Sequence, residues 1–251
     1  MEKAPPSLHN KKAFEEALKN YEVSPHGKEV LNSTPFVALS GIAGGGRNTI
    51  IRVLVETGKY IFAVSDTTRP PKVRDGRLEV DGVDYYFREE AAMLQDIQNG
   101  EFIEAEIIHN QQVSGTSIRE IERTVATGKI PIHDFEYGGI KNVVKAKPDA
   151  VIIGLVPPNY DEWIRRLYNR EPLHDQEFLN RLVTAEKVLE NMLAHPYFKL
   201  LVNDSTDECA QLLRRIVEDG NYAEEEHARG RKVVEDLLEA VKKELSGRLT
   251  S

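Results

Sequence analysis

A glycine-rich segment near the front of the chain has the composition of a phosphate-binding loop. Residues 40–50 read Ser-Gly-Ile-Ala-Gly-Gly-Gly-Arg-Asn-Thr-Ile, follow an apolar run and precede residues with helical spacing. Glycines let backbone N–H groups approach a phosphate because no Cβ intrudes, and the following helix N-terminus adds positive charge. The segment predicts nucleotide binding, with a glycine-rich turn that holds no ligand as the alternative.

Two positions of this loop depart from the pattern Gly-x-x-x-x-Gly-Lys-Ser/Thr. Gly41 and Gly46 occupy the fixed glycines, whereas Arg47 replaces the lysine and Asn48 replaces the hydroxyl residue. Arginine keeps the positive charge but is longer and planar. An amide oxygen can still serve Mg²⁺, directly or through water, although Mg²⁺ demands near-ideal octahedral geometry. The loop is therefore either an adapted nucleotide site or a relic of one.

The overall composition excludes several classes of function. Thirty-three Lys and Arg against 41 Asp and Glu give a net charge of −8, which argues against a nucleic-acid-binding surface. The chain has neither an apolar run of membrane-spanning length nor an apolar core in its first residues, so we expect a cytoplasmic protein that does not enter a membrane. Its single cysteine, Cys209, excludes an intrachain disulfide and a thiolate metal cluster.

Short apolar runs alternate with segments of helical spacing between residues 36 and 219. This alternation predicts an α/β fold with a parallel sheet and helices on both faces. The expected strands are residues 36–39, 60–64, 102–104, 130–134, 150–156 and 197–202. The expected helices are residues 49–56, 89–99, 117–127, 138–147, 160–169, 176–194 and 207–219.

Helical pieces at both ends lie outside this alternation. One apolar stripe near the front consists of Phe14, Ala17, Leu18 and Tyr21, and Ser24-Pro25 can begin a second short helix. A second stripe near the end consists of Val234, Leu237, Leu238, Val241 and Leu245. We expect both pieces to pack on their own domain. A homodimer or a partner contact is the alternative, so the chain is expected to be a monomer or a homodimer.

Several motifs in order make residues 36–220 resemble the guanylate kinase family. After the loop come Ser65-Asp-Thr-Thr-Arg69, Asp81-Gly-Val-Asp-Tyr85, Glu104, Gly115-Thr-Ser, Asp134-Phe-Glu, Val156-Pro-Pro and Val202-Asn-Asp. The resemblance implies the parallel-sheet P-loop nucleoside monophosphate kinase fold, with helical extensions at both ends. It divides the chain into an extension (1–34), a core (35–68, 118–163 and 182–220), a GMP-binding region (69–117), a lid (164–181) and a C-terminal amphipathic helix (221–251).

The resemblance implies a guanine-reading edge. By position, Ser65 would donate to the purine O6, and Glu104 would accept from N1–H and the 2-amino group. Adenine has no N1–H donor, so it would leave the carboxylate unpaired. Thr116 corresponds to a second hydroxyl contact to the base, and Asp134 to a further acceptor near the 2-amino group.

The resemblance also implies a clamp on the monophosphate, formed by the Arg69 guanidinium and the Tyr85 phenol. Lys72 has the spacing of the family's second arginine, but four extra residues before Tyr85 leave Arg74 or Arg77 open instead. Ser114 replaces the tyrosine that usually precedes the Gly-Thr/Ser pair, which weakens the clamp.

For ATP and catalysis the resemblance implies three further sets of residues. The ATP site would use Gly41, Ala43, Gly44, Gly45, Gly46, Arg47, Asn48, Thr49 and, at the adenine, Asn203. The catalytic residues would be Arg47 and the lid arginines Arg166, Arg170 and Arg181, which neutralise charge on the transferring group. Mg²⁺ would be held by Asn48 and, through water, by Glu136.

The expected function is that of an ATP- and Mg²⁺-dependent kinase that converts GMP or dGMP to the diphosphate, with small-molecule nucleotides as its partners. Because of Arg47 and Asn48, the alternative is a catalytically silent module that binds a nucleotide or a phosphorylated protein. Ser114 and the extra residues before Tyr85 also leave a different acceptor open. The choice between ATP and GTP as donor is open as well.

Overall fold

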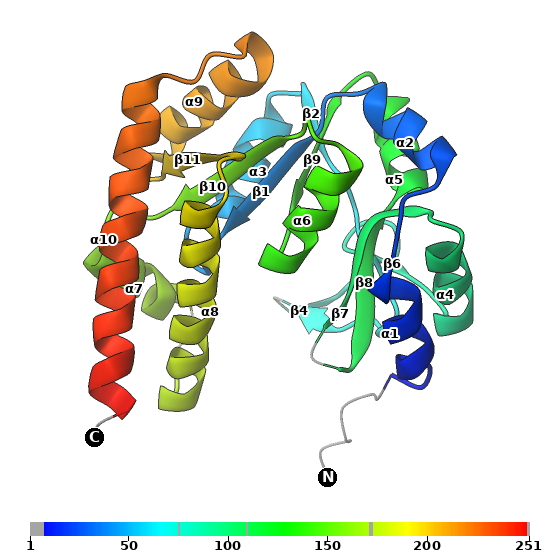
Figure 1. The fold of residues 1–251 in the computed structure, drawn as a ribbon, viewed down its shortest axis with the longest axis horizontal. Helices are drawn as coiled ribbons and strands as arrows, with labels where there is room; N and C mark the ends of the chain where they lie inside the picture. Colours follow the sequence, from blue (N-terminus) through cyan, green and yellow to red (C-terminus); the bar gives the residue numbers. More distant parts are fainter. Residues whose placement is uncertain (1–7, 75, 109, 171–172, 250–251) are drawn as a thin grey trace. The chain divides into compact units, whose positions relative to one another are not determined.

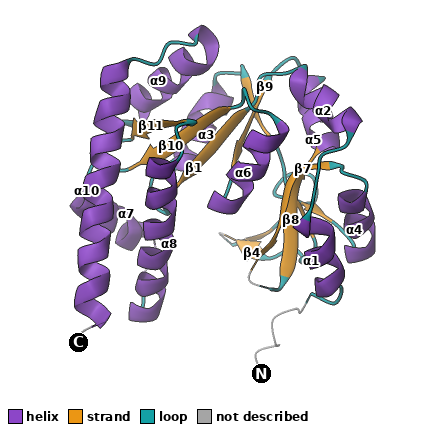
Figure 2. Cartoon of the chain, viewed as in Figure 1, coloured by secondary structure: helices purple, strands orange, loops and turns teal. Residues whose placement is uncertain are grey.

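The computed structural model describes residues 8–74, 76–108, 110–170 and 173–249 (Figures 1 and 2). The chain forms two compact units. The first contains the described parts of residues 1–36, 60–133 and 141–150, and the second those of residues 37–59, 134–140 and 151–251. The residues of helix α6 (Tyr137–Ala146) are divided between the two.

Three parallel strands form the centre of the second unit. They are β1 (Val37–Gly41), β10 (Val151–Val156) and β11 (Phe198–Val202), in the order β11-β10-β1. Every residue of β1 and all but the first of β10 are buried, as expected for parallel strands covered on both faces. Helices α3 (Arg47–Glu56) and α9 (Thr206–Asp219) pack together over one face, and α8 (Asp175–Ala194) and α10 (Glu224–Leu249) over the other (Figure 1).

The C-terminal helix α10 packs on its own unit, as the sequence predicts. Val234, Leu237 and Val241 of its apolar stripe are fully or almost fully buried, and the helix contacts α8 and β11. A Cβ on Gly230 would lie 2.3 Å from the carbonyl oxygen of Leu200. The absence of a side chain at that position therefore lets α10 lie directly against β11.

The first unit contains a sheet of mixed direction, in the order β6-β3-β8-β7. Its long strands β7 (Phe102–Ile108) and β8 (Gln112–Ser117) are antiparallel. Strand β3 (Asp66–Thr67) lies antiparallel to β8 and parallel to β6 (Tyr86–Phe87). Strands β2 (Tyr60–Phe62) and β9 (Ile130–Asp134) are parallel to each other and are not part of this mixed sheet.

The placement of residues 102–104 in the parallel sheet is wrong. They begin β7, which pairs in antiparallel fashion with β8. Residues 109–111 alone connect these two strands, and a connection this short permits a hairpin, whereas a parallel pair needs a crossover of about a dozen residues or more. The sequence analysis did not anticipate β8, because its alternation of polar and small residues lacks an apolar run.

The N-terminal segment packs on the first unit. Helix α1 (Lys11–Lys19) contacts α4 (Glu90–Gln98), and α2 (Pro25–Asn32) contacts α5 (Ile118–Val125). Phe14 is fully buried in an apolar cluster with Met93 and Phe102, and Ser24 caps α2 by accepting from a backbone N–H three residues on at 3.0 Å. The expected packing of this segment on its own domain is confirmed.

Tyr21 anchors the N-terminal segment to the start of β7. Its hydroxyl donates to the carbonyl oxygen of Phe102 at 2.6 Å and accepts from the N–H of the same residue at 2.7 Å. Burial raises the pKa of the phenol far above its usual range, so it stays a donor. In the described part of the chain, no helix combines the length and the apolar character needed to cross a membrane.

Candidate functional site

The glycine-rich loop connects β1 to α3 and follows a backbone path that its glycines permit. Gly44 and Gly46 have φ angles of 80° and 98°, a region that glycine enters without a steric penalty. The N–H of Gly45 donates to the carbonyl oxygen of Ile42 at 3.0 Å. Gly46 precedes α3, so this helix begins at Arg47 with its positive end toward the loop.

Two of the loop glycines are also required by the protein's own packing. A Cβ on Gly41 would lie 2.4 Å from the carbonyl oxygen of Leu155, and a Cβ on Gly46 would lie 2.0 Å from Nδ2 of Asn203. Both distances are far below van der Waals contact. Internal packing therefore accounts for these two glycines without reference to a ligand.

Two side chains hold carbonyl groups of the loop. Nδ2 of Asn203, which is buried, donates to the oxygen of Gly45 at 3.0 Å. Nε1 of Trp163, in helix α7 (Tyr160–Arg170), donates to the oxygen of Ala43 at 2.7 Å. Asn203, expected at the adenine of the donor, thus contacts the glycine-rich loop itself.

Arg47 extends toward acidic groups at the end of β9. Its Nη1 lies 3.8 Å from Oδ2 of Asp134, and its Nη2 lies 3.9 Å from Oε1 of Glu136. Nη1 also donates to the carbonyl oxygen of Phe135 at 3.4 Å. These are long contacts for ion pairs. Asp134, expected at the base, and Glu136, expected near Mg²⁺, therefore both lie beside the arginine that replaces the loop lysine.

Arg166, one of the arginines expected in a lid, is joined to the same loop through Asn203. Its Nη2 donates to the carbonyl oxygen of Asn203 at 2.9 Å, and its Nε donates to Oε1 of Glu162 at 2.7 Å. Hydrogen bonds from Arg165 and Arg166 lower the pKa of Glu162 to about 2. Helix α7 and the loop are therefore connected through Asn203.

The other two arginines expected in the lid lie farther along the chain. Arg181, in α8, donates from Nη2 to Oε1 of Glu177 at 3.0 Å, one helical turn earlier. Arg170 is the last residue of α7, and its side chain lies outside the described part of the structure, as do residues 171–172. Pairing within a helix is the usual state of an exposed arginine, so these contacts do not distinguish a lid from a solvated surface.

In the first unit, the residues expected to read the base form a row across three strands. Glu104 on β7 is the register partner of Thr116 on β8. Asp66 on β3 is the register partner of Gly115, so the antiparallel step before it brings Ser65 beside Thr116. All three side chains of the row are buried. The expected base-reading residues other than Asp134 therefore gather on one sheet.

Glu104 is a buried carboxyl group with few partners. Its Oε1 accepts from the N–H of Thr116 at 3.1 Å and from the hydroxyl at 3.3 Å. Burial, reinforced by the nearby charge of Glu106, raises its pKa from the ordinary 4.5 to about 8 despite these bonds. Perturbed acids of this kind are concentrated at functional sites.

Ser65 makes a contact that the sequence analysis missed. Its hydroxyl lies 3.1 Å from Nε2 of His133, whose Nδ1 lies 2.6 Å from the carbonyl oxygen of Ala63. The histidine is buried near the end of β9. In the sequence, the signal for this contact was a single histidine, His133, within the expected strand 130–134.

Arg69 is buried and bound on two sides. Its Nη1 and Nη2 donate to the two oxygens of Glu79 at 2.5 and 2.9 Å, and its guanidinium carbon lies 4.7 Å from the centre of the Tyr85 ring. The Arg69 hydrogen bonds lower the pKa of Glu79, and the same pair raises that of Arg69. Arg69 and Tyr85, expected as the phosphate clamp, are therefore adjacent.

The residues between Lys72 and Glu79 form a hairpin of strands β4 (Val73–Arg74) and β5 (Arg77–Leu78). Lys72 donates its backbone N–H to Oε2 of Glu79 at 2.9 Å. Arg77 makes two 2.7 Å hydrogen bonds to Asp84, which directs its guanidinium to that carboxylate. The side chain of Arg74 lies outside the described part of the structure.

Ser114 of β8 lies beside β3. Its hydroxyl is 2.8 Å from that of Thr67. At the position where the family usually carries a tyrosine, this chain therefore has a serine that forms a cross-strand hydrogen bond.

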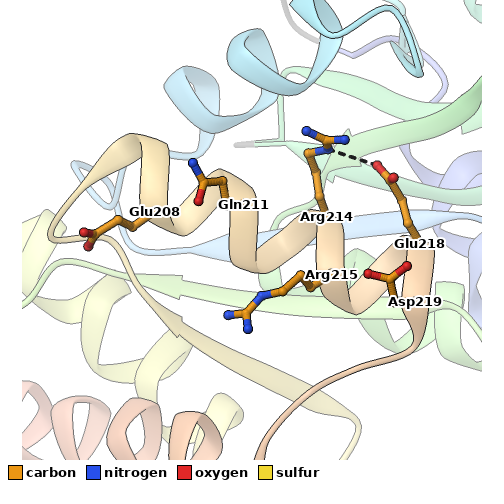
Figure 3. Close-up of a pocket in the computed structure, with 6 residues that line it drawn as sticks. All are labelled: Glu208, Gln211, Arg214, Arg215, Glu218 and Asp219. Carbon is orange, nitrogen blue, oxygen red and sulfur yellow. Dashed lines mark hydrogen bonds and ion pairs between the residues drawn. The ribbon is translucent and has the colours of Figure 1, made fainter.

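An open depression on α9 offers no comparable chemistry. It is lined by Glu208, Gln211, Arg214, Arg215, Glu218 and Asp219 (Figure 3). Arg214 and Glu218 form a 3.0 Å pair one turn apart, so its opposite charges neutralise each other on one helix surface.

The sequence profile of the guanylate kinase family matches residues 33–220. The chain belongs to the guanylate kinase family. It is 32% identical over 187 residues to the guanylate kinase of Legionella pneumophila (strain Lens), covering 74% of this chain and 86% of that protein. It is also 32% identical over 184 residues to guanylate kinase 1 of Oryza sativa, covering 72% of this chain. This chain matches about half of the rice protein's length, 47%.

Solved structures support the fold of this guanylate kinase family member. The crystal structure of guanylate kinase from Anaplasma phagocytophilum has a TM-score of 0.55 at 23% identity, covering 82% of this chain and 94% of that one. The predicted P-loop nucleoside monophosphate kinase fold is confirmed.

Two residues that the family resemblance did not supply, Glu79 and His133, contact expected site residues. Glu79 lies within the stretch that carries extra residues, so its spacing from Tyr85 gave no guidance about its partner. Both contacts join residues that only the folded chain brings together.

Proposed function

We propose that this chain transfers the γ-phosphoryl group of ATP to GMP or dGMP, giving ADP and GDP or dGDP. The observation that carries the proposal is the buried Glu104 carboxyl group, held by Thr116 in a row with Ser65. A buried acceptor selects a base edge that donates hydrogen bonds, because any other base leaves it unpaired. Guanine offers two such donors, N1–H and the 2-amino group.

Each unit would bind its own phosphate groups. Arg69 and Tyr85 would hold the monophosphate, and a phosphate anion would compete with Glu79 for the guanidinium fork. The loop and Arg47 would bind the donor phosphates at the positive end of α3. The lid arginines would neutralise charge that spreads over the transferring group.

Mg²⁺ would enter with ATP as part of the donor substrate. Asn48 lies exposed on the first turn of α3, and the Glu136 carboxylate is mostly exposed, so both oxygens are accessible. Within the described residues, no three acidic, histidine or cysteine side chains cluster as a metal site. Asn48 and Glu136 would therefore act together with phosphate oxygens and water, as is usual for Mg²⁺.

A coupled assay of diphosphate formation tests the proposal. The protein is incubated with Mg²⁺, ATP or GTP as donor, and each common ribonucleoside and deoxyribonucleoside monophosphate as acceptor. We expect turnover with GMP and dGMP and much less with AMP. If only another monophosphate is phosphorylated, the protein is still a kinase, but its acceptor is not GMP or dGMP.

A silent nucleotide- or phosphopeptide-binding module is the second candidate. The observation that favours it is the position of Arg47, whose guanidinium lies beside Asp134 and Glu136. Two carboxylates so close to the loop cation reduce its attraction for donor phosphates. A silent module would show GMP binding without GMP-dependent ADP release.

The double variant Arg47→Lys, Asn48→Ser separates the two candidates. It restores the side chains that phosphate-binding loops ordinarily carry. In a module that lost activity through these two residues alone, the change should create or raise kinase activity. In an enzyme adapted to arginine, activity should fall or change little, because Asp134 and Glu136 already accommodate the planar guanidinium.

The cytoplasmic location and the oligomeric state of the protein stay predictions.

A further inference from the structure

His133 contacts Ser65, a residue of the candidate base site, and the main chain at Ala63. The residue is 6% exposed, and its ring stacks on that of Phe62 with the ring centres 5.1 Å apart. Nδ1 lies 2.6 Å from the carbonyl oxygen of Ala63, and Nε2 lies 3.1 Å from Oγ of Ser65. Stacking and two polar contacts therefore fix the orientation of the ring.

The contact with Ala63 determines where the ring carries its proton. A carbonyl oxygen only accepts hydrogen bonds, so Nδ1 is the protonated nitrogen. In the neutral imidazole Nε2 is then an acceptor. As long as the ring is neutral, the Ser65 hydroxyl donates its one hydrogen bond to Nε2, and toward any third group Ser65 can then only accept.

Hydrogen bonds hold the main chain on both sides of Ser65. The N–H of Val64 donates to Oε1 of Glu120 at 2.8 Å. The carbonyl oxygen of Ser65 accepts from the N–H of Tyr86 at 2.9 Å. Because the backbone is held on both sides of the Cα atom, the Ser65–His133 bond can be broken only by rotating the hydroxyl, which would leave a buried Nε2 without this donor.

This polarity matters because of where Ser65 lies. The sheet register places it next to Thr116, which pairs on its other side with Glu104, and both are proposed to face the base. The O6 atom of guanine is an acceptor, and two acceptors cannot form a hydrogen bond.

We propose that His133 is a specificity-determining residue. By accepting the hydrogen bond that the Ser65 hydroxyl can donate, it prevents Ser65 from donating to O6 of the purine. The inference rests on the proposed function, which places a purine monophosphate against this sheet. Recognition of guanine over adenine then depends on Glu104, and the substituent at position six contributes little.

Two ligands that differ in one atom test this proposal. GMP and 6-thioguanosine monophosphate share N1–H and the 2-amino group, but sulfur is a much weaker acceptor than the oxygen it replaces. Dissociation constants for both are measured by calorimetry with the wild type, Ser65→Ala, His133→Leu and the double variant. Thermal unfolding of each variant reports folding.

The wild type should bind the two nucleotides within about threefold of each other, because no hydrogen bond to position six is lost. His133→Leu releases the hydroxyl and should bind GMP about tenfold more tightly than the thio analogue. The double variant should return to the wild-type ratio, since the effect passes through Ser65.

The single variant Ser65→Ala keeps the test decisive if His133→Leu does not fold, because its ratio should equal that of the wild type. A wild-type preference for GMP that Ser65→Ala abolishes would overturn the proposal. An unchanged ratio in folded His133→Leu would also overturn it, while leaving the proposed function intact. Failure of both nucleotides to bind the wild type would overturn the proposed function and this inference with it.

Discussion

Replacing Glu104 by glutamine should make the protein more stable and a weaker binder of GMP. Glu104 is 7% exposed as a residue, and its burial raises the pKa of the carboxyl group from 4.5 to about 8. In the unfolded chain the group ionises near its ordinary pKa, whereas in the folded protein it stays protonated until the pH approaches 8. The folded state therefore loses stability as the pH rises from 4.5 to 8.

The size of this loss follows from the two pKa values. Each pH unit between them costs about 1.4 kcal/mol. From an ordinary pKa of 4.5 and a folded pKa of about 8, the loss reaches about 3 kcal/mol at pH 7 and about 5 kcal/mol above pH 8. Glutamine does not ionise, and its amide oxygen can still accept from Thr116. Glu104→Gln should therefore match the wild type near pH 4.5 and become progressively more stable above it.

The same variant should lose GMP affinity, because the amide nitrogen presents a donor to N1–H or the 2-amino group. The expected loss is about 1–3 kcal/mol. GMP binding to the wild type near pH 7 should release a proton, since guanine pairs with the ionised carboxylate. Calorimetry in two buffers with different ionisation enthalpies measures this release, and urea unfolding at pH 5, 7 and 8.5 measures stability.

The exposed Glu89→Gln variant is the matched control, because it removes the same charge at an exposed position of the first unit. Its stability relative to the wild type should stay nearly constant across the three pH values. Parallel stability profiles for Glu104→Gln and Glu89→Gln would refute the reasoning about burial. Equal GMP affinity for Glu104→Gln and the wild type would remove Glu104 from the base site.

Three further substitutions test the glycine-rich loop, the buried Arg69–Glu79 pair and the anchor of the N-terminal segment. Arg47→Ala should weaken ATP binding or transition-state stabilisation by about 1.5–3 kcal/mol, measured by calorimetry and single-turnover kinetics; unchanged values for both would make Arg47 a relic. Glu79→Gln removes a charge from the buried pair with Arg69 and should lower the free energy of unfolding by about 1–3 kcal/mol, and an unaltered urea midpoint would contradict this. Tyr21→Phe leaves the N–H and carbonyl of Phe102 without the phenol and should cost about 1–3 kcal/mol, whereas wild-type stability would show that water replaces the hydroxyl.

Local sequence patterns were sufficient to predict much of the fold. The strands of the second unit were predicted because apolar runs without alternation are typical of parallel strands covered on both faces. The α10 stripe predicted the buried face of that helix for the same kind of reason, since side chains three and four residues apart share a face. The departures at Arg47 and Asn48 are also visible in the sequence alone, because a loop motif is a matter of residue type and spacing.

The chemistry of the site was decided by tertiary structure. Glu104 acquires its raised pKa from burial and from Glu106, while Thr116 reaches it through a hairpin that the sequence did not indicate. Pairing of Arg69 with Glu79 depends on the intervening hairpin. The polarity of Ser65 is set by a histidine 68 residues away in the chain. Residue types therefore determined which groups could serve a nucleotide, whereas proton positions and charge states depend on desolvation and on partners distant in sequence, which only the folded chain supplies.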